Sequence, residues 1–78
     1  MSNYYSDVQK ANRYIDQAVQ EKVFRNGEEL DLNELKLKLT SIFPVGDKVV
    51  DKRIELLAKV YPSLRLVDDK ILDVGGVE

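Results

Sequence analysis

Cysteine, histidine and tryptophan are missing from this 78-residue sequence, and proline occurs only twice. Without cysteine the chain forms no disulfide bonds. Without cysteine and histidine it also lacks the ligands of the usual zinc sites and the nucleophile–base pairs of many enzymes. We therefore expect no enzymatic activity, no catalytic residues, no metal site, no cofactor and no small-molecule substrate.

Long apolar segments are also missing. No stretch approaches the ~20 apolar residues of a membrane span, and MSNYYSDVQK at the N-terminus has no apolar run behind a basic start. We therefore expect no membrane contact and a cytoplasmic location. Hydrophobic residues make up 44% of the chain and charged residues 33%, which predicts one soluble globular domain over residues 1–78. A domain of this size has a marginal core, so a homodimer remains an option.

The charge balance shows no basic excess, because 12 Lys and Arg residues stand against 14 Asp and Glu residues, for a net charge of -2. Domains that bind nucleic acids usually carry a basic surface. The sequence therefore supports DNA binding only if its cations gather on one face.

Apolar residues recur at helical spacing near the N-terminus and predict a helix over about residues 3–22. They are Tyr4, Val8, Ala11, Ile15, Ala18 and Val19. Tyr5 and Tyr14 fall outside this stripe. Their rings either lie along the edges of the core or form a partner or dimer surface, since aromatic residues are enriched in interface cores.

Residues 23–30, VFRNGEEL, break the helical pattern. Asn26-Gly27 is a strong turn dipeptide because both residues tolerate positive φ. We predict a loop here, with at most a short strand near Glu29 and Leu30.

A second helix, over about residues 31–43, has a clearly marked start. Asp31 can cap the first free N–H groups, and Glu34 completes a capping-box pattern. Within this segment LKLKLT alternates with period two, as a strand does. The cap signals and the helix propensity of Leu and Lys favour the helix. Leu37 is then expected to be partly exposed or to contact a partner.

Pro44 disfavours helix for the residue before it and Gly46 relaxes the corner, so a third helix is predicted over about residues 47–61. Its core stripe consists of Val50, Ile54, Leu57 and Tyr61. A second apolar row beside this stripe consists of Val49, Leu56 and Val60. So wide an apolar arc predicts a helix that is buried on two sides.

Residues 63–74, SLRLVDDKILDV, are typical of a β-hairpin, and a tail follows over residues 75–78. A three-residue loop over 68–70 gives one wholly apolar face and one opposite-charge pair across the strands. Its pairs are Leu66 with Leu72, Leu64 with Val74, and Arg65 with Asp73. A two-residue loop would place Asp73 on the apolar face, so we favour the longer loop.

The predicted order of helix, short strand or loop, helix, tight turn, helix and hairpin resembles the winged-helix branch of the helix-turn-helix proteins. The most specific part of the resemblance lies in and before FPVGDKVVDKRIELL, residues 43–57. The matching positions are Leu35, Val45, Gly46, Val50, Ile54 and Leu57. Gly46-Asp47 stands where family members usually carry a Ser or Thr cap. The resemblance implies an α+β, mainly helical fold of three helices plus a C-terminal β-hairpin wing, similar to small DNA-binding regulators of archaea, phages and plasmids.

The resemblance also implies that the helix over 47–61 enters the major groove of double-stranded DNA. The candidate DNA-binding residues are Lys48, Lys52, Arg53, Lys59, Arg65 and Lys70. The three lysines of this helix share the face opposite its core stripe, where they can neutralise phosphates or donate to guanine. Asp51 and Glu55 leave a second interpretation open, because pairs of Asp51 with Lys48 and of Glu55 with Lys52 or Lys59 would make an ordinary solvated face. Arg53, at the edge of the apolar arc, could reach either a phosphate or an acidic neighbour.

The tip of the predicted wing, Asp68-Asp69, is acidic, which argues against insertion into the minor groove. A pair of carboxylates at a hairpin tip is first of all a turn and offers too few oxygen ligands for calcium. An alternative function is therefore a winged-helix protein-protein interaction module without DNA binding. Its expected partner surface is formed by Tyr5, Tyr14, Leu37 and the edge of the hairpin.

Overall fold

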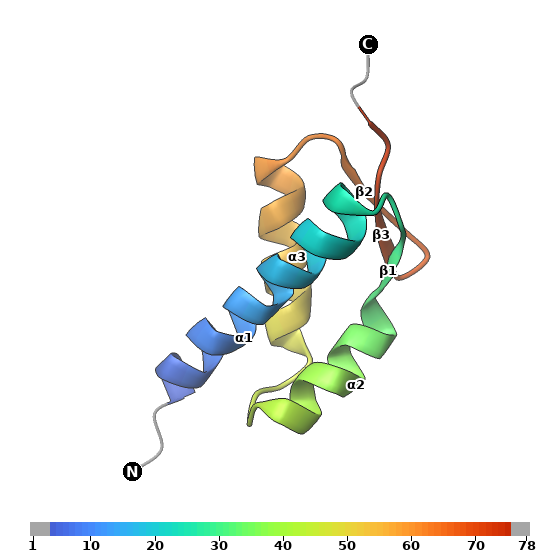
Figure 1. The fold of residues 1–78 in the computed structure, drawn as a ribbon. Helices are drawn as coiled ribbons and strands as arrows, with labels where there is room; N and C mark the ends of the chain where they lie inside the picture. Colours follow the sequence, from blue (N-terminus) through green and yellow to red (C-terminus); the bar gives the residue numbers. More distant parts are fainter. Residues whose placement is uncertain (1–3, 76–78) are drawn as a thin grey trace.

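The computed structural model describes residues 4–75 and shows an α+β, mainly helical fold (Figure 1). The elements are α1 (Tyr4–Ala18), η1 (Val19–Arg25), β1 (Leu30–Asp31), α2 (Leu32–Ile42), α3 (Lys48–Val60), β2 (Leu64–Val67) and β3 (Lys70–Asp73). The strands form an antiparallel sheet of order β1-β3-β2. The predicted tail lies outside the described residues except for Gly75, as does the first residue of the first predicted helix.

Each helix and strand contributes to one apolar core. Its buried residues are Ala11, Ile15, Val19, Val23, Leu30, Leu32, Leu35, Leu39, Val45, Val50, Ile54, Leu57, Leu64 and Ile71. No charged or polar side chain within residues 4–75 is buried among them. Charged side chains of the described chain therefore act at the surface.

The first helix runs three residues further than the sequence predicts, because it widens into the π-helical segment η1. Here the N–H of Asn26 donates to the carbonyl of Glu21 at 3.1 Å, a five-residue step. The wider turn keeps Val23 in the core and brings the ring of Phe24 to 5.2 Å from that of Tyr61. The expected loop over 23–30 is therefore wrong for residues 23–25, since a 3.6-residue period does not describe a π-helical turn.

The second helix begins as the sequence predicts. The Asp31 carboxylate accepts from the backbone N–H groups of Asn33 at 2.9 Å and Glu34 at 3.3 Å. The short strand before it, β1, pairs with β3, which confirms the strand expected near Leu30. Leu37 is 74% exposed on the helix surface. The segment LKLKLT is thus helical despite its strand-like alternation.

The third helix buries one of its two apolar rows. Its core stripe is buried at Val50, Ile54 and Leu57, as the spacing predicts. The fourth predicted member, Tyr61, is wrong, because it follows the last residue of α3 with an extended backbone and is 37% exposed. The second row is largely open, with Leu56 46% and Val60 58% exposed. The expected burial on two sides is therefore wrong, because α1 covers this flank of α3 incompletely.

The hairpin has a two-residue loop, and the predicted three-residue loop is wrong. Asp68 and Asp69 have φ of 50° and 63°, the left-handed pair of a type I′ turn, whose twist suits a hairpin. This register sets Leu64 opposite Asp73 and Leu66 opposite Ile71, in place of the predicted Leu66–Leu72, Leu64–Val74 and Arg65–Asp73 pairs. Loss of the wholly apolar face costs little stability because β3 is the central strand of the sheet. Ile71 on β3 is buried, whereas Leu66 lies on the edge strand and stays exposed.

Candidate nucleic-acid interface on α3

The face of α3 that points away from the core carries a row of lysines. Lys48 and Lys52 are one helical turn apart, and Lys59 continues the same face, directly opposite the buried stripe. All three side chains are exposed. We call these three residues the lysine row.

The acidic residues of α3 form no ion pair with the lysine row. Asp51 instead receives the ammonium of Lys36 from α2 at 3.0 Å, and this hydrogen bond raises the pKa of Lys36 above its usual value. The pairs that the sequence left open as an alternative, of Asp51 with Lys48 and of Glu55 with Lys52 or Lys59, do not form. Within residues 4–75 the lysine row has no ion-pair partner.

Arg53 contacts an acidic neighbour, which is one of the two interactions that the sequence left open. Its Nε donates to Asp16 Oδ1 at 2.8 Å and its Nη2 to Asp16 Oδ2 at 2.6 Å, a bidentate pair that ties α3 to α1. The hydrogen bond to Asp16 raises the pKa of Arg53. Its guanidinium therefore faces the α1 flank of α3, where Arg53 lines a hollow together with Lys48 and Lys52.

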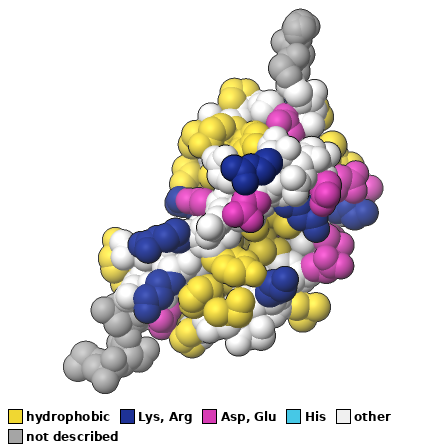
Figure 2. All heavy atoms as spheres, viewed as in Figure 1, with side chains coloured by type: hydrophobic (Ala, Val, Ile, Leu, Met, Phe, Trp, Pro, Cys, Tyr) yellow, Lys and Arg dark blue, Asp and Glu magenta, His cyan; other side chains and the backbone are white. Residues whose placement is uncertain are grey.

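The two cations of the hairpin are also engaged. Nη1 of Arg65 donates to the backbone carbonyls of Pro62 and Leu64, and Lys70 Nζ lies 3.6 Å from Glu29 Oε1. Figure 2 shows acidic side chains gathered on the side of the molecule where β1 and the hairpin loop lie. Of the six candidate DNA-binding residues, the structure thus gathers the three lysines of α3 on one face. Arg53, Arg65 and Lys70 are instead engaged by other groups of the chain.

The three residues expected to form a partner surface lie apart. Tyr14 is half-buried, with its ring 6.2 Å from that of Phe43 in an edge-on contact. Tyr5 is 72% and Leu37 74% exposed, and neither lines the pocket to which Tyr14 belongs. They form separate exposed positions on α1 and α2.

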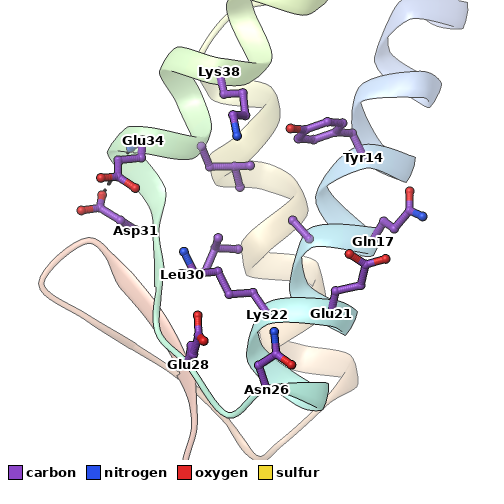
Figure 3. Close-up of a pocket in the computed structure, with 12 residues that line it drawn as sticks. Tyr14, Gln17, Glu21, Lys22, Asn26, Glu28, Leu30, Asp31, Glu34 and Lys38 are labelled. Carbon is purple, nitrogen blue, oxygen red and sulfur yellow. Dashed lines mark hydrogen bonds between the residues drawn. The ribbon is translucent and has the colours of Figure 1, made fainter.

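The pocket beside Tyr14 has a volume of about 580 Å³ and lies between α1, η1, β1 and α2 (Figure 3). Four carboxylates line it, from Glu21, Glu28, Asp31 and Glu34. Lys22 and Lys38 line it as well and offset part of the negative charge. In the part of the chain that the structure describes, no group of three or more acidic residues has the geometry to hold a metal ion.

The second apolar row of α3 is exposed at Leu56 and Val60, a surface feature that the sequence did not predict, whereas Val49 is partly buried against the core. Val49, Leu56 and Val60 follow a helical stripe that is visible in the sequence, but their exposure depends on how far α1 reaches across them. None of the described helices is both long and apolar enough to cross a membrane.

Comparison with known proteins adds no identification: the chain gives no significant match to a protein-family model, a curated protein or a solved structure.

Proposed function

We propose that this protein is a small winged-helix DNA-binding protein, a transcriptional regulator or a replication or partition accessory, that contacts duplex DNA through α3. The observation that carries the proposal is the lysine row, which is exposed and has no ion-pair partner within residues 4–75. Asp51, the acid expected to neutralise Lys48, is paired with Lys36.

The arrangement of the elements supports this function. The chain order α1, β1, α2, α3, β2, β3 and the sheet order β1-β3-β2 resemble the winged-helix layout. A short corner joins α2 to α3, with Phe43 extended ahead of Pro44. In proteins of this layout the second helix of the motif lies in the major groove, which at about 12 Å wide accommodates one α-helix.

The chemistry of the lysine row suits a phosphate backbone. Each lysine that neutralises a phosphate releases about 0.9 counterion, so three contacts give a slope of about -3 for log K against log salt. Between 50 mM and 200 mM salt the affinity should then fall roughly fortyfold. Lysine ammonium groups can also donate to guanine in the major groove.

The test is fluorescence anisotropy of a labelled duplex of random sequence with the full chain, titrated at several salt concentrations. The variant Lys48→Glu/Lys52→Glu should abolish binding, while Lys10→Glu/Lys38→Glu makes the same charge change at exposed lysines of α1 and α2 and should retain most of it. Absence of binding at low salt, or equal losses in both variants, would contradict the proposal.

The acidic hairpin favours a second candidate, a winged-helix module that binds another protein and not DNA. Asp68 and Asp69 occupy the hairpin tip, where they would repel phosphates, and both hairpin cations are engaged. This candidate predicts no salt-sensitive binding of duplex DNA, so the same titration separates the two functions.

A further inference from the structure

A hollow of about 440 Å³ lies between α1 and α3, beside the lysine row. In Figure 1 the N-terminal parts of α1 and α3 diverge from the point where the two helices cross, and the lining of the hollow comes from these parts. Its polar lining is formed by Lys48, Lys52 and Arg53 of α3 and by Tyr4 and Asn12 of α1, and its apolar lining by Val8, Val49 and Leu56. Among the described residues no Asp or Glu lines this hollow.

The hollow carries uncompensated positive charge. Asp16 offsets the charge of Arg53 through their bidentate pair, but Lys48 and Lys52 have no ion-pair partner within residues 4–75. Asn12 is half-buried, and within the same residues its side-chain amide makes no hydrogen bond. An anion in the hollow would therefore meet two unpaired ammonium groups and an amide that is ready to donate.

The acidic residues in and just before α3 lie on its opposite flank, toward α2. Lys36 of α2 donates to Asp51, and this hydrogen bond together with the negative charges of Asp51 and Asp47 raises the pKa of Lys36. Glu55 follows Asp51 by about one helical turn and so shares its side of α3. The two flanks of α3 therefore differ: carboxylates gather toward α2, whereas the hollow toward α1 has none in its lining.

A helix that lies in the major groove has a phosphate backbone on each side, because its diameter of about 10–12 Å fills a groove about 12 Å wide. We propose that the backbone on the α1 side of α3 lies in this hollow, where Lys52 neutralises a phosphate and the side-chain amide of Asn12 donates to it. The deoxyribose then packs on the apolar lining beside Leu56. Asn12 is thereby a DNA-contact residue on a helix outside the helix-turn-helix.

Charge complementarity selects the α1 flank over the other surfaces beside α3. On the α2 flank Lys36 is already paired with Asp51, and the hairpin presents Asp68 and Asp69 at its tip. Contacts to phosphate and sugar fix the register and orientation of a protein on the duplex. The inference rests on the proposed function, since it needs α3 in the major groove, and it adds which flank of α3 holds the backbone.

The test changes the charge at Asn12 in both directions in the full chain and measures anisotropy of a random-sequence duplex. Asn12→Lys should raise the affinity roughly eightfold near 0.1 M salt and steepen the salt slope by about 1, because it adds a phosphate contact. Asn12→Asp should lower the affinity roughly fivefold, as expected for like charges about 4 Å apart in water.

Gln17 supplies the matched control, because it is an exposed amide on α1 that lines the pocket on the α2 side. It lies about 140° around the helix from Asn12. Gln17→Lys and Gln17→Glu should each change the affinity by less than about twofold, since the width of α1 separates them from the hollow by about one Debye length.

The proximity of Asn12 to the duplex can also be measured directly, because the chain has no cysteine of its own. A photo-crosslinker attached to Asn12→Cys should capture the duplex, and one attached to Gln17→Cys should capture much less. Circular dichroism checks that each variant stays helical. If the wild type binds duplex through the lysine row but the changes at Asn12 and Gln17 act equally, this inference alone is overturned. A wild type that binds no duplex at low salt overturns both proposals.

Discussion

The exposed face of α3 and the C-terminal hairpin both carry cations, but the two regions differ in what those cations already contact. On α3 the lysine row has no ion-pair partner among residues 4–75. On the hairpin Arg65 donates to two backbone carbonyls and Lys70 lies beside Glu29. Counting cations along the sequence therefore overstates both regions, but the hairpin more, because both of its cations are engaged and on α3 only Arg53 is.

The difference matters for the energy of binding a polyanion. A solvated lysine exchanges water and counterions for a phosphate, whereas Arg65 must first give up hydrogen bonds within its own chain. The hairpin tip adds two carboxylates, from Asp68 and Asp69, that a phosphate backbone would repel. The comparison predicts that α3 supplies the binding free energy and that the hairpin contributes little.

The largest effect is expected from reversing the charge of Lys48 and Lys52 together. We expect Lys48→Glu/Lys52→Glu to lower the affinity for duplex DNA by roughly a hundredfold or more, since two counterion-releasing contacts become repulsive. Replacement of the same lysines by Ala should reduce the salt slope by about 2. Anisotropy titrations over a salt series measure both quantities, and an unchanged slope would show that α3 is not the contact.

The next effect compares one cation from each region. Lys59→Ala should weaken DNA binding roughly eightfold near 0.1 M salt and lower the slope by about 1. Arg65→Ala, its matched control on the hairpin, should change the affinity much less. Equal losses in the two variants would remove the distinction between helix and hairpin.

The sequence predicts the helices of this fold well because their signals are local. The cap of Asp31, the stop at Pro44 and the stripe of Val50 and Ile54 each depend on neighbours within one or two turns, and all are found in the structure. The lysine row follows from the same periodicity. Its lack of neutralising partners does not, since Asp51 is taken by Lys36 from another helix.

The features that the sequence did not predict depend on tertiary contacts or on backbone geometry. The π-helical end of the first helix is stabilised where Val23 enters the core and Phe24 meets Tyr61. The hairpin register follows the left-handed φ angles of Asp68 and Asp69, whereas our prediction weighed the apolar face of an isolated hairpin. A third strand, β1, covers the other edge of β3 and alters which residues of that face are buried.

A smaller effect concerns Arg53, which the sequence grouped with the DNA-binding cations. Arg53→Ala removes the bidentate pair with Asp16 and should lower the free energy of unfolding by about 1 kcal/mol, a modest value because both side chains are partly exposed. The affinity of the folded protein for DNA should fall less than in Lys59→Ala. Urea denaturation measures the change in stability and anisotropy measures the change in DNA affinity. A large loss of affinity without a loss of stability would show that Arg53 contacts the DNA.

The smallest effect on DNA binding is expected at the hairpin tip. Asp68→Asn/Asp69→Gly installs the residues that a type I′ turn prefers, so it should raise the free energy of unfolding by about 0.5 kcal/mol because left-handed φ is less strained for Asn and Gly. The variant also removes two negative charges. If the tip stays more than a Debye length of about 10 Å from the phosphates, the affinity should change by less than about twofold. A rise of an order of magnitude would mean that the hairpin approaches the DNA and that its two carboxylates weaken a contact it otherwise makes.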